Sequence, residues 1–136
     1  TPLPEDCLRI TVISPDMVAC QPKLVEILPQ FFSFIQGSVL VAHNASFDMG
    51  FVREQSSFLG YDFDWPAICT LRLAREYLSA LPRKNLDTIA EHYGLSFEAR
   101  HRSIGDVKVT VAVLENLLRA EAADLVTWKN FKPFRV

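Results

Sequence analysis

A continuous apolar run, Val39-Leu40-Val41-Ala42, restricts the possible fold of this chain more than any other feature of its sequence. It follows Gly37, a residue type that commonly ends helices. Such a short apolar run is typical of a strand that is buried on both faces, as in parallel sheets covered by helices. The run leads directly into the polar sequence His43-Asn44-Ala45-Ser46-Phe47-Asp48. Polar side chains are therefore expected at the carboxyl end of a buried strand, where α/β sheets bind their ligands.

Helical patterns lie on both sides of this run. Before it, a helix is predicted from Lys23 to the Gly37 cap, because apolar residues recur there at helical spacing: Leu24, Ile27, Leu28, Phe31, Phe32 and Ile35. After it, Ser46 is the predicted N-cap of a helix that extends to about Leu59 and places Asp48 in its first turn. The residues expected to face inward on that second helix are Phe47, Phe51, Val52, Phe58 and Leu59.

Three further elements are predicted downstream. A second short strand is expected around residues 67–70, followed by a helix that Pro82 terminates. Asn85 is the predicted N-cap of a smaller helix, with these residues inward: Leu86, Ile89, Ala90 and Tyr93. The last helix is predicted from about Ile104, and its expected inward residues follow three- and four-residue steps: Ile104, Val107, Val111, Leu114 and Leu118.

Strands and helices alternate along the chain, which predicts one layered α/β domain. Residues 1–122 are assigned to this domain, and residues 123–136 to a C-terminal tail or linker. Only two strands are convincing, although a sheet usually contains about five or six. We therefore expect part of the sheet to be missing from this sequence.

Composition excludes few functions. Fourteen Lys and Arg against sixteen Asp and Glu give a formal net charge of −2, a balance that neither supports nor excludes a nucleic-acid ligand. The longest apolar run is far shorter than the roughly 20 residues of a membrane span, and no basic and apolar leader opens the chain. The three cysteines cannot all pair, which favours a reducing compartment. A cytoplasmic protein without membrane contact is expected.

Two polar clusters have residue types suited to catalysis. Asp48 lies where a helix begins beyond the buried strand, although an acid there can simply interact favourably with the helix dipole. His101 and Asp106 lie five residues apart, so they converge only if His101 is on a loop folded back over Asp106. Taken separately, the second cluster can also be a solvated loop histidine and a surface acid.

Taken together, the two clusters resemble a known family. HNASFD and HRSIGD, with CTLRLAR and NLDTIAEHYGL between them, are similar to the second and third motifs of the DEDD exonucleases, histidine subclass. That subclass includes the proofreading ε subunit of bacterial DNA polymerase III, the exonuclease inserted in Gram-positive replicative polymerases, and ribonuclease T. The resemblance spans about residues 5–119 and implies a ribonuclease H-like exonuclease fold.

The resemblance also implies roles for individual residues. Asp48 and Asp106 would be two of the four metal-binding carboxylates, and His101 would be the general base. Two Mg²⁺ or Mn²⁺ ions about 4 Å apart suit in-line cleavage of a phosphodiester, and hard ions prefer oxygen ligands. A histidine, with an ordinary pKa of about 6.5, can accept a proton at neutral pH.

Four residues are predicted to contact the substrate: His43, Asn44, Phe47 and Lys84. For three of them a simpler explanation stays open. Asn44 can cap the hinge before the helix, Phe47 can pack in the core, and Lys84 can be a solvated loop residue.

The sequence departs from the family at its start. DEDD exonucleases open with an apolar strand that ends in Asp-x-Glu, and then add two antiparallel strands. Neither feature is found here, and Glu5 and Asp6 follow Pro4 in a predicted loop, so they are not assigned to the missing pair. We therefore expect an exonuclease domain that lacks its first strands and is weakly active or inactive, while the parent protein is expected to carry them upstream.

The resemblance implies a metal-dependent 3′→5′ exonuclease, a hydrolase that removes nucleotides from single-stranded 3′ ends, most simply in DNA proofreading or repair. RNA stays open as a substrate, because these motifs do not inspect the 2′-hydroxyl. The alternative is a non-catalytic module of the same shape that docks a polymerase or a nucleic acid. Expected partners are single-stranded DNA, a DNA polymerase subunit or fused domain, and a second copy bound through an exposed sheet edge.

Overall fold

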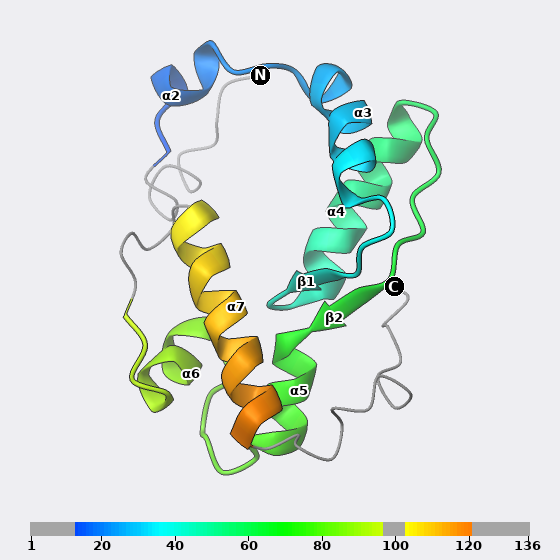
Figure 1. The fold of residues 1–136 in the computed structure, drawn as a ribbon. Coiled ribbons are helices and arrows are strands. Elements are labelled where there is room, and N and C mark those ends of the chain that lie inside the picture. Colours follow the sequence, from blue (N-terminus) through cyan, green and yellow to red (C-terminus); the bar gives the residue numbers. More distant parts are fainter. Residues whose placement is uncertain (1–12, 97–102, 121–136) are drawn as a thin grey trace.

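The computed structural model describes residues 13–96 and 103–120 (Figure 1). Its elements, in chain order, are α2 (Pro15–Ala19), α3 (Leu24–Ile35), β1 (Leu40–Ala42), α4 (Ala45–Phe58), β2 (Ala67–Cys69), α5 (Thr70–Tyr77), α6 (Leu86–His92) and α7 (Ser103–Ala120). Within these two ranges, no helix is both long and apolar enough to cross a membrane. The predicted domain boundary near residue 122 lies outside the described residues.

The sheet pairs β1 with β2 in parallel, with Leu40 opposite Ala67 and Ala42 opposite Cys69. The backbone N–H of Leu40 also donates to the Pro66 carbonyl at 2.9 Å, which extends the pairing by one bond. Because α4 connects the two strands, β1, α4 and β2 form a βαβ unit, and the predicted α/β alternation is confirmed. These are the only strands in the part of the chain that the structure describes, which agrees with the predicted shortage.

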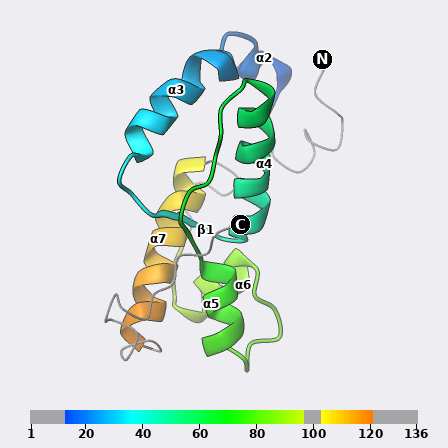
Figure 2. The same ribbon diagram turned by 90° about the vertical axis from the view of Figure 1, so that its right-hand side faces the viewer.

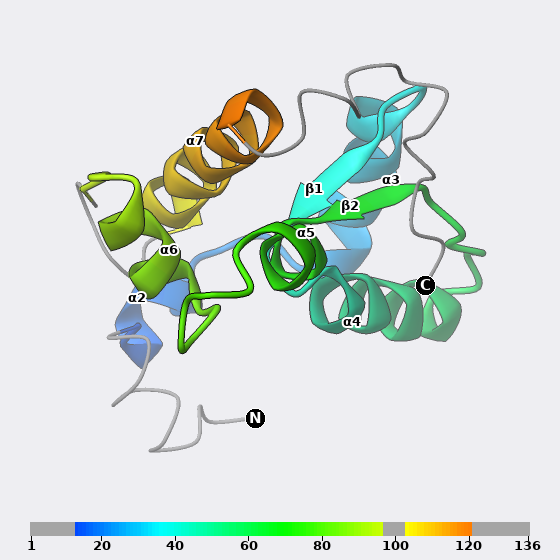
Figure 3. The same ribbon diagram turned by 90° about the horizontal axis from the view of Figure 1, so that it is seen from below.

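Helices pack on the sheet from different sides. Helix α4 contacts both strands and α7 contacts β1, so the strands lie between these two helices when the molecule is seen from below (Figure 3). Helices α5 and α6 pack against α7. The side view shows α3 and α4 in the upper half of the molecule and α5 with α6 in the lower half (Figure 2).

The hydrophobic core has two parts that match these halves. The first joins α5, α6 and α7 through these buried residues: Ala74, Leu78, Leu86, Ile89, Ala90, Val109, Val113 and Leu117. The second joins α3, α4, β2 and the loop before β2 through these: Ile35, Ala45, Met49, Phe63, Ala67 and Cys69. Leu40 and Ala42 of β1 are partly buried against this second part, so the sheet belongs to it.

The predicted inward stripe of α7 is wrong in its first half. Ile104, Val107 and Val111 are 71%, 59% and 46% exposed, whereas Val109, Val113 and Leu117 are buried. Helix α7 carries apolar residues on two faces, and packing against α5 and α6 selects the second face. Periodicity cannot choose between two apolar stripes on one helix, because both repeat at helical spacing.

The predicted inward face of α4 is wrong for its phenylalanines, although Val52, which was also predicted inward, packs against the core. Phe47, Phe51 and Phe58 are 72%, 59% and 86% exposed, and the buried residues are instead Ala45, Met49 and Ser56. The small side chain of Ala45, which has no exposed surface, lets the first turn of α4 approach the strands closely. The large aromatic residues therefore lie on the outer face.

Capping signals are confirmed where a single side chain or glycine ends a helix. The Oδ1 atom of Asn85 accepts a hydrogen bond from the Thr88 backbone N–H at 2.9 Å, as an N-cap should. Gly37, directly after α3, has a φ of +75°, the left-handed conformation that glycine adopts most easily.

Two valines on α7 test which of its faces is buried. We expect Val113→Ala to lower the free energy of unfolding by about 2 kcal/mol, because Val113 has no exposed surface and its removal leaves a cavity. The matched change Val107→Ala should cost less than about 0.5 kcal/mol. Urea unfolding of both variants measures the difference, and equal losses would mean that the Val107 face is covered in solution.

Candidate active site

The site is built where β1 passes into α4. Asn44 is the N-cap of α4 and adopts the left-handed conformation, with φ of 70° and ψ of 50°. Asn is one of the few residues other than glycine that visit this region readily. The predicted N-cap, Ser46, instead lies inside the first turn, where its hydroxyl donates to Asn44 Oδ1 at 3.3 Å. The sharp turn at Asn44 directs the first turn of α4 back over the end of the sheet.

His43, the residue before this turn, links three segments. Its Nε2 atom lies 2.9 Å from the Lys84 backbone carbonyl, and its Nδ1 atom lies 2.9 Å from the Thr70 hydroxyl. A carbonyl only accepts, so Nε2 carries a proton, and in the neutral ring Nδ1 accepts from Thr70. Both ring nitrogens therefore have protein partners, which gives His43 a structural role. Its predicted substrate contact stays a prediction.

A cavity of about 630 Å³ lies beside this hinge and contains both acids predicted for the site, Asp48 and Asp106. Its other lining residues come from α3, β1, the start of α4, the Asn85 cap of α6, and α7: Phe31, Leu40, Val41, Ala42, His43, Met49, Asn85, Leu86, Val107, Thr110 and Val111. Asp48 lies in the first turn of α4 and Asp106 in the first turn of α7, so two helix starts face one cavity. The fold thus brings together acids that are far apart in the sequence.

The two acids have different surroundings. Asp48 is exposed as a residue, yet partial burial of its carboxyl raises the pKa above its ordinary value, and a backbone hydrogen bond opposes the rise. Asp106 is half-buried, and its backbone carbonyl accepts from the Thr110 hydroxyl at 2.8 Å. The raised pKa of Asp48 means that its negative charge is disfavoured unless a positive charge is nearby.

The donor set in this cavity fits part of a divalent-cation site. Two carboxylates supply the oxygen ligands that Mg²⁺ and Mn²⁺ prefer. Within residues 13–96 and 103–120, no group of three or more His, Cys, Asp and Glu side chains could hold a metal ion. Asp48 and Asp106 would therefore hold a cation only together with further ligands. The predicted base, His101, lies outside the described residues.

The other predicted substrate residues, Phe47 and Lys84, differ in how accessible their side chains are to a ligand. Phe47 is 72% exposed on the outer face of α4, so its side chain is accessible to a ligand and is not part of the core. The Lys84 ammonium donates to the backbone carbonyls of Ser79, at 3.2 Å, and of Leu81. The Lys84 side chain therefore makes its hydrogen bonds within its own loop.

One residue important to the hinge escaped the sequence analysis. Thr70 is fully buried at the start of α5, and besides its bond to His43 its hydroxyl is 3.5 Å from the Ala42 carbonyl. The signal was its position at the end of the strand predicted around residues 67–70, next to the start of a predicted helix. Ala45 shows a related contact, since its backbone N–H donates to the Cys69 sulfur at 3.4 Å.

Acids near the carboxyl end of a parallel strand lie where open α/β sheets bind their ligands. The family described as Exonuclease (RNase_T) matches residues 1–114, and the chain belongs to this family. Its resemblance to DEDD exonucleases such as the DNA polymerase III ε subunit is thereby confirmed.

Similar proteins include several from bacterial replication. The chain is 38% identical over 113 residues to DNA polymerase III PolC-type of Clostridium perfringens, covering 83% of this chain and 8% of that protein. It is 37% identical over 120 residues to a DNA polymerase III subunit epsilon-like protein of Rhodobacter capsulatus, covering 87% and 17%. It is 31% identical over 117 residues to DNA polymerase III subunit epsilon of Aquifex aeolicus, covering 85% and 58%. The chain thus spans only part of each of these relatives.

The raised pKa of Asp48 predicts a pH-dependent effect of Asp48→Asn. As the pH rises above about 3.9, the ordinary value for Asp, wild-type Asp48 ionises more readily in the unfolded chain than in the folded protein. The wild type therefore loses stability through this window and the variant does not. We expect the variant's gain in unfolding free energy to be larger at pH 7 than at pH 3, with chelator present. The exposed loop residue Asp62, changed to Asn, is the control, and a gain that shrinks toward pH 7 would contradict the prediction.

The left-handed Asn44 gives a second prediction, because glycine and alanine separate its backbone from its side chain. Asn44→Ala should lower the unfolding free energy by about 1–2 kcal/mol, since a Cβ opposes this conformation in most residues. Asn44→Gly removes the same side chain without that steric opposition. Urea unfolding should therefore rank glycine above alanine, and the reverse order would show that the turn does not depend on the left-handed backbone.

Proposed function

We propose that this chain is the metal-binding and substrate-binding part of a 3′→5′ exonuclease that acts on single-stranded 3′ ends, in DNA proofreading or repair. The observation that carries the proposal is the shared cavity of Asp48 and Asp106. These acids belong to two separate sequence motifs, yet they face one space at the carboxyl end of β1. Membership of the exonuclease family supports the reaction class.

Each residue has a defined task in this proposal. The carboxylates of Asp48 and Asp106 hold Mg²⁺ or Mn²⁺ through oxygen atoms, and family membership supports dependence on divalent metal. When bound, two such ions would relieve negative charge on the attacking and leaving oxygens of the phosphodiester. His101 accepts the proton of the attacking water at neutral pH. His43 holds the hinge, and the exposed ring of Phe47 is available to stack on a base.

The proposed site needs more ligands than the described residues provide. In the family pattern the other two carboxylates come from an apolar strand that ends in Asp-x-Glu. The open edge of β1 and the exposed stripe of α7 border the cavity, which is where an added strand would bring carboxylates beside Asp48 and Asp106. We propose that such a strand completes the site.

The relatives support a replication context. Several are named as DNA polymerase III proteins, which favours DNA as the substrate, a polymerase subunit or fused domain as the partner, and work in the cytoplasm. The assignment of residues 1–122 to the exonuclease domain and of 123–136 to a linker belongs to the same proposal.

A non-catalytic docking module is the second candidate. The observation that favours it is the set of large aromatic side chains on the outer face of α4, where Phe47, Phe51 and Phe58 are all more than half exposed. Exposed apolar surface of this kind is typical of a protein contact site. Within residues 13–96 and 103–120, β1 pairs only with β2, so its other edge is the proposed contact between two copies.

The decisive measurement is Mn²⁺-dependent degradation of a 3′-labelled single-stranded DNA oligonucleotide. We expect activity in an upstream-extended protein that carries an Asp-x-Glu strand, and much weaker activity in the present chain. In the extended protein, Asp48→Asn, Asp106→Asn and His101→Ala should each lower the rate by at least about 100-fold, because each removes a metal ligand or the base.

The control is Asp62→Asn, which removes the same charge from an exposed loop outside the cavity. It should keep the wild-type rate. A parallel assay on a matching RNA oligonucleotide compares the two substrates. Inactivity of both the present and the extended protein would reject the exonuclease proposal in favour of the docking module.

A further inference from the structure

A second cavity adjoins the first on the other side of His43. Its volume is about 440 Å³, and its lining residues come from the hinge, α5 and the start of α6: His43, Asn44, Leu71, Arg75, Lys84 and Asn85. Two of these, His43 and Asn85, also line the cavity that holds Asp48 and Asp106. The two cavities are therefore neighbours across the hydrogen bond from His43 to the Lys84 carbonyl.

The two cavities carry opposite charge. The first contains two acids, whereas the charged residues that line the second are Arg75 and Lys84. Arg75 is exposed in the last turn of α5, and among the described residues no hydrogen bond or ion pair occupies its guanidinium. Leu71 lies one turn earlier on α5 and lines the same cavity. A guanidinium with five N–H donors thus lines the second cavity.

The opposite wall of this cavity is held in place before any ligand arrives. The Lys84 ammonium is bound to the Ser79 carbonyl, its own carbonyl is bound by His43, and the Asn85 side chain is bound to Thr88 N–H. The loop between α5 and α6 is therefore fixed by three separate contacts, so little ordering is needed on binding. On the near wall, the Asn44 side chain uses its oxygen for Ser46, and its amide N–H groups remain as donors.

We propose that the second cavity binds a backbone phosphate of the nucleic-acid strand whose 3′-terminal linkage lies in the first cavity, with Arg75 as the positioning residue. This inference rests on the proposed function and extends it from the cleaved linkage to the neighbouring nucleotide. Arginine matches a phosphate through two parallel N–H bonds, and the nearby Lys84 charge strengthens the attraction. The first cavity is proposed to hold cations at the 3′-terminal linkage and the second to hold the next phosphate. A bound strand would therefore cross His43 in a single orientation.

The test is the salt dependence of single-stranded DNA binding, measured by fluorescence anisotropy in the presence of EDTA. For single strands, the logarithm of the binding constant falls with the logarithm of salt concentration by a slope of about 0.7 for each neutralised phosphate. We expect Arg75→Ala to make this slope shallower by about 0.7 and to weaken binding at low salt. Arg75→Lys should restore the slope, because it keeps the charge.

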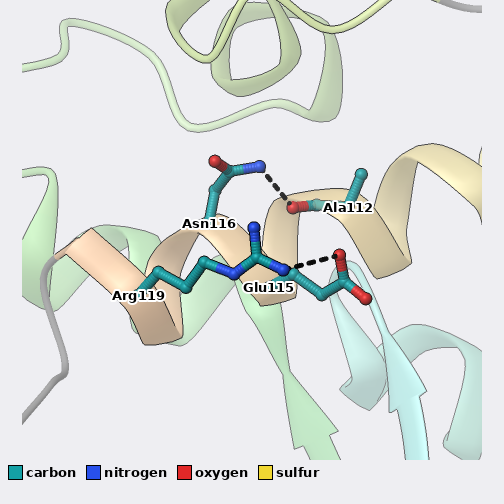
Figure 4. Close-up of polar contacts among 4 residues, drawn as sticks. All are labelled: Ala112, Glu115, Asn116 and Arg119. Atoms are coloured by element: carbon teal, nitrogen blue, oxygen red, sulfur yellow. Dashed lines mark hydrogen bonds and ion pairs between the residues drawn. The ribbon is translucent and has the colours of Figure 1, made fainter.

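The matched control is Arg119→Ala. Arg119 is an exposed arginine near the end of α7, where its guanidinium lies 4.0 Å from Glu115 one turn earlier, beside the contact between Asn116 and the Ala112 carbonyl (Figure 4). It lines neither cavity. Its removal changes the net charge by the same amount as Arg75→Ala, so it should leave the slope unchanged. Equal slopes for the two alanine variants, or no binding of DNA by the wild type, would overturn the inference.

Two further arms separate the possible reasons for a result. If Arg75→Ala weakens binding of a 5′-mononucleotide as much as binding of the oligonucleotide, the cavity holds a terminal phosphate group and the proposed strand path is wrong. Nuclease activity tests the proposed function independently. An Arg75 effect without activity in the extended protein would keep the phosphate site and reject the exonuclease, whereas activity without an Arg75 effect would reject this inference alone.

Discussion

The imidazole of His43 holds together the three segments on which both cavities depend. His43 directly follows β1. Its ring is hydrogen-bonded to Thr70, the first residue of α5, and to the Lys84 carbonyl in the loop before α6. The βαβ unit supplies only a short parallel pair, so this side-chain bridge determines how the lower half of the molecule meets the end of the sheet. The Thr70 hydroxyl has an alternative acceptor in the Ala42 carbonyl at 3.5 Å. A doubly protonated ring could donate to Thr70 while Thr70 turns to Ala42, so the bridge can persist in both charge states.

Helix α7 shows how one element serves both packing and chemistry. Its buried stripe, which includes Val113 and Leu117, joins it to α5 and α6, and this packing sets the position of the whole helix. Asp106 is then delivered to the cavity by the first turn of the same helix. The exposed apolar stripe of α7, with Val107 and Val111, lines that cavity together with residues of β1. The buried stripe of α7 thus fixes the position of the helix whose first turn carries Asp106.

The sequence predicted features that depend on a few neighbouring residues. The strand at residues 40–42, the Asn85 cap and the presence of Asp48 in the first turn of α4 follow from local patterns, and the structure has all three. The expected burial of this strand on both faces is wrong, because Val41 is 37% exposed and its two neighbours in β1 are only partly buried. Features that depend on distant partners were harder. The inward faces of α4 and α7 were misassigned, because apolar residues occur on more than one face and only the packing partners choose between them. Ser46 has the side chain of an N-cap. The N-cap is instead Asn44, which has a left-handed backbone, so α4 begins two residues earlier than predicted. Arg75 had no motif of its own, since its role comes from a cavity formed by three segments.

Burial raises the pKa of Asp48, so the empty site disfavours its negative charge. The cation of the proposed function would offset that cost. The N-terminus of α4 attracts a negative charge, which should lower the pKa of an acid in its first turn. Desolvation nevertheless dominates and raises the pKa of Asp48, because much of the cavity wall consists of apolar side chains such as Leu40, Met49 and Val111. A second acid, Asp106, lines the same cavity. In the proposed function, a divalent ion bound there would favour the ionised form of Asp48. In the proposed function these two acids would bind a cation, and the neighbouring cavity lined by Arg75 and Lys84 would receive a backbone phosphate.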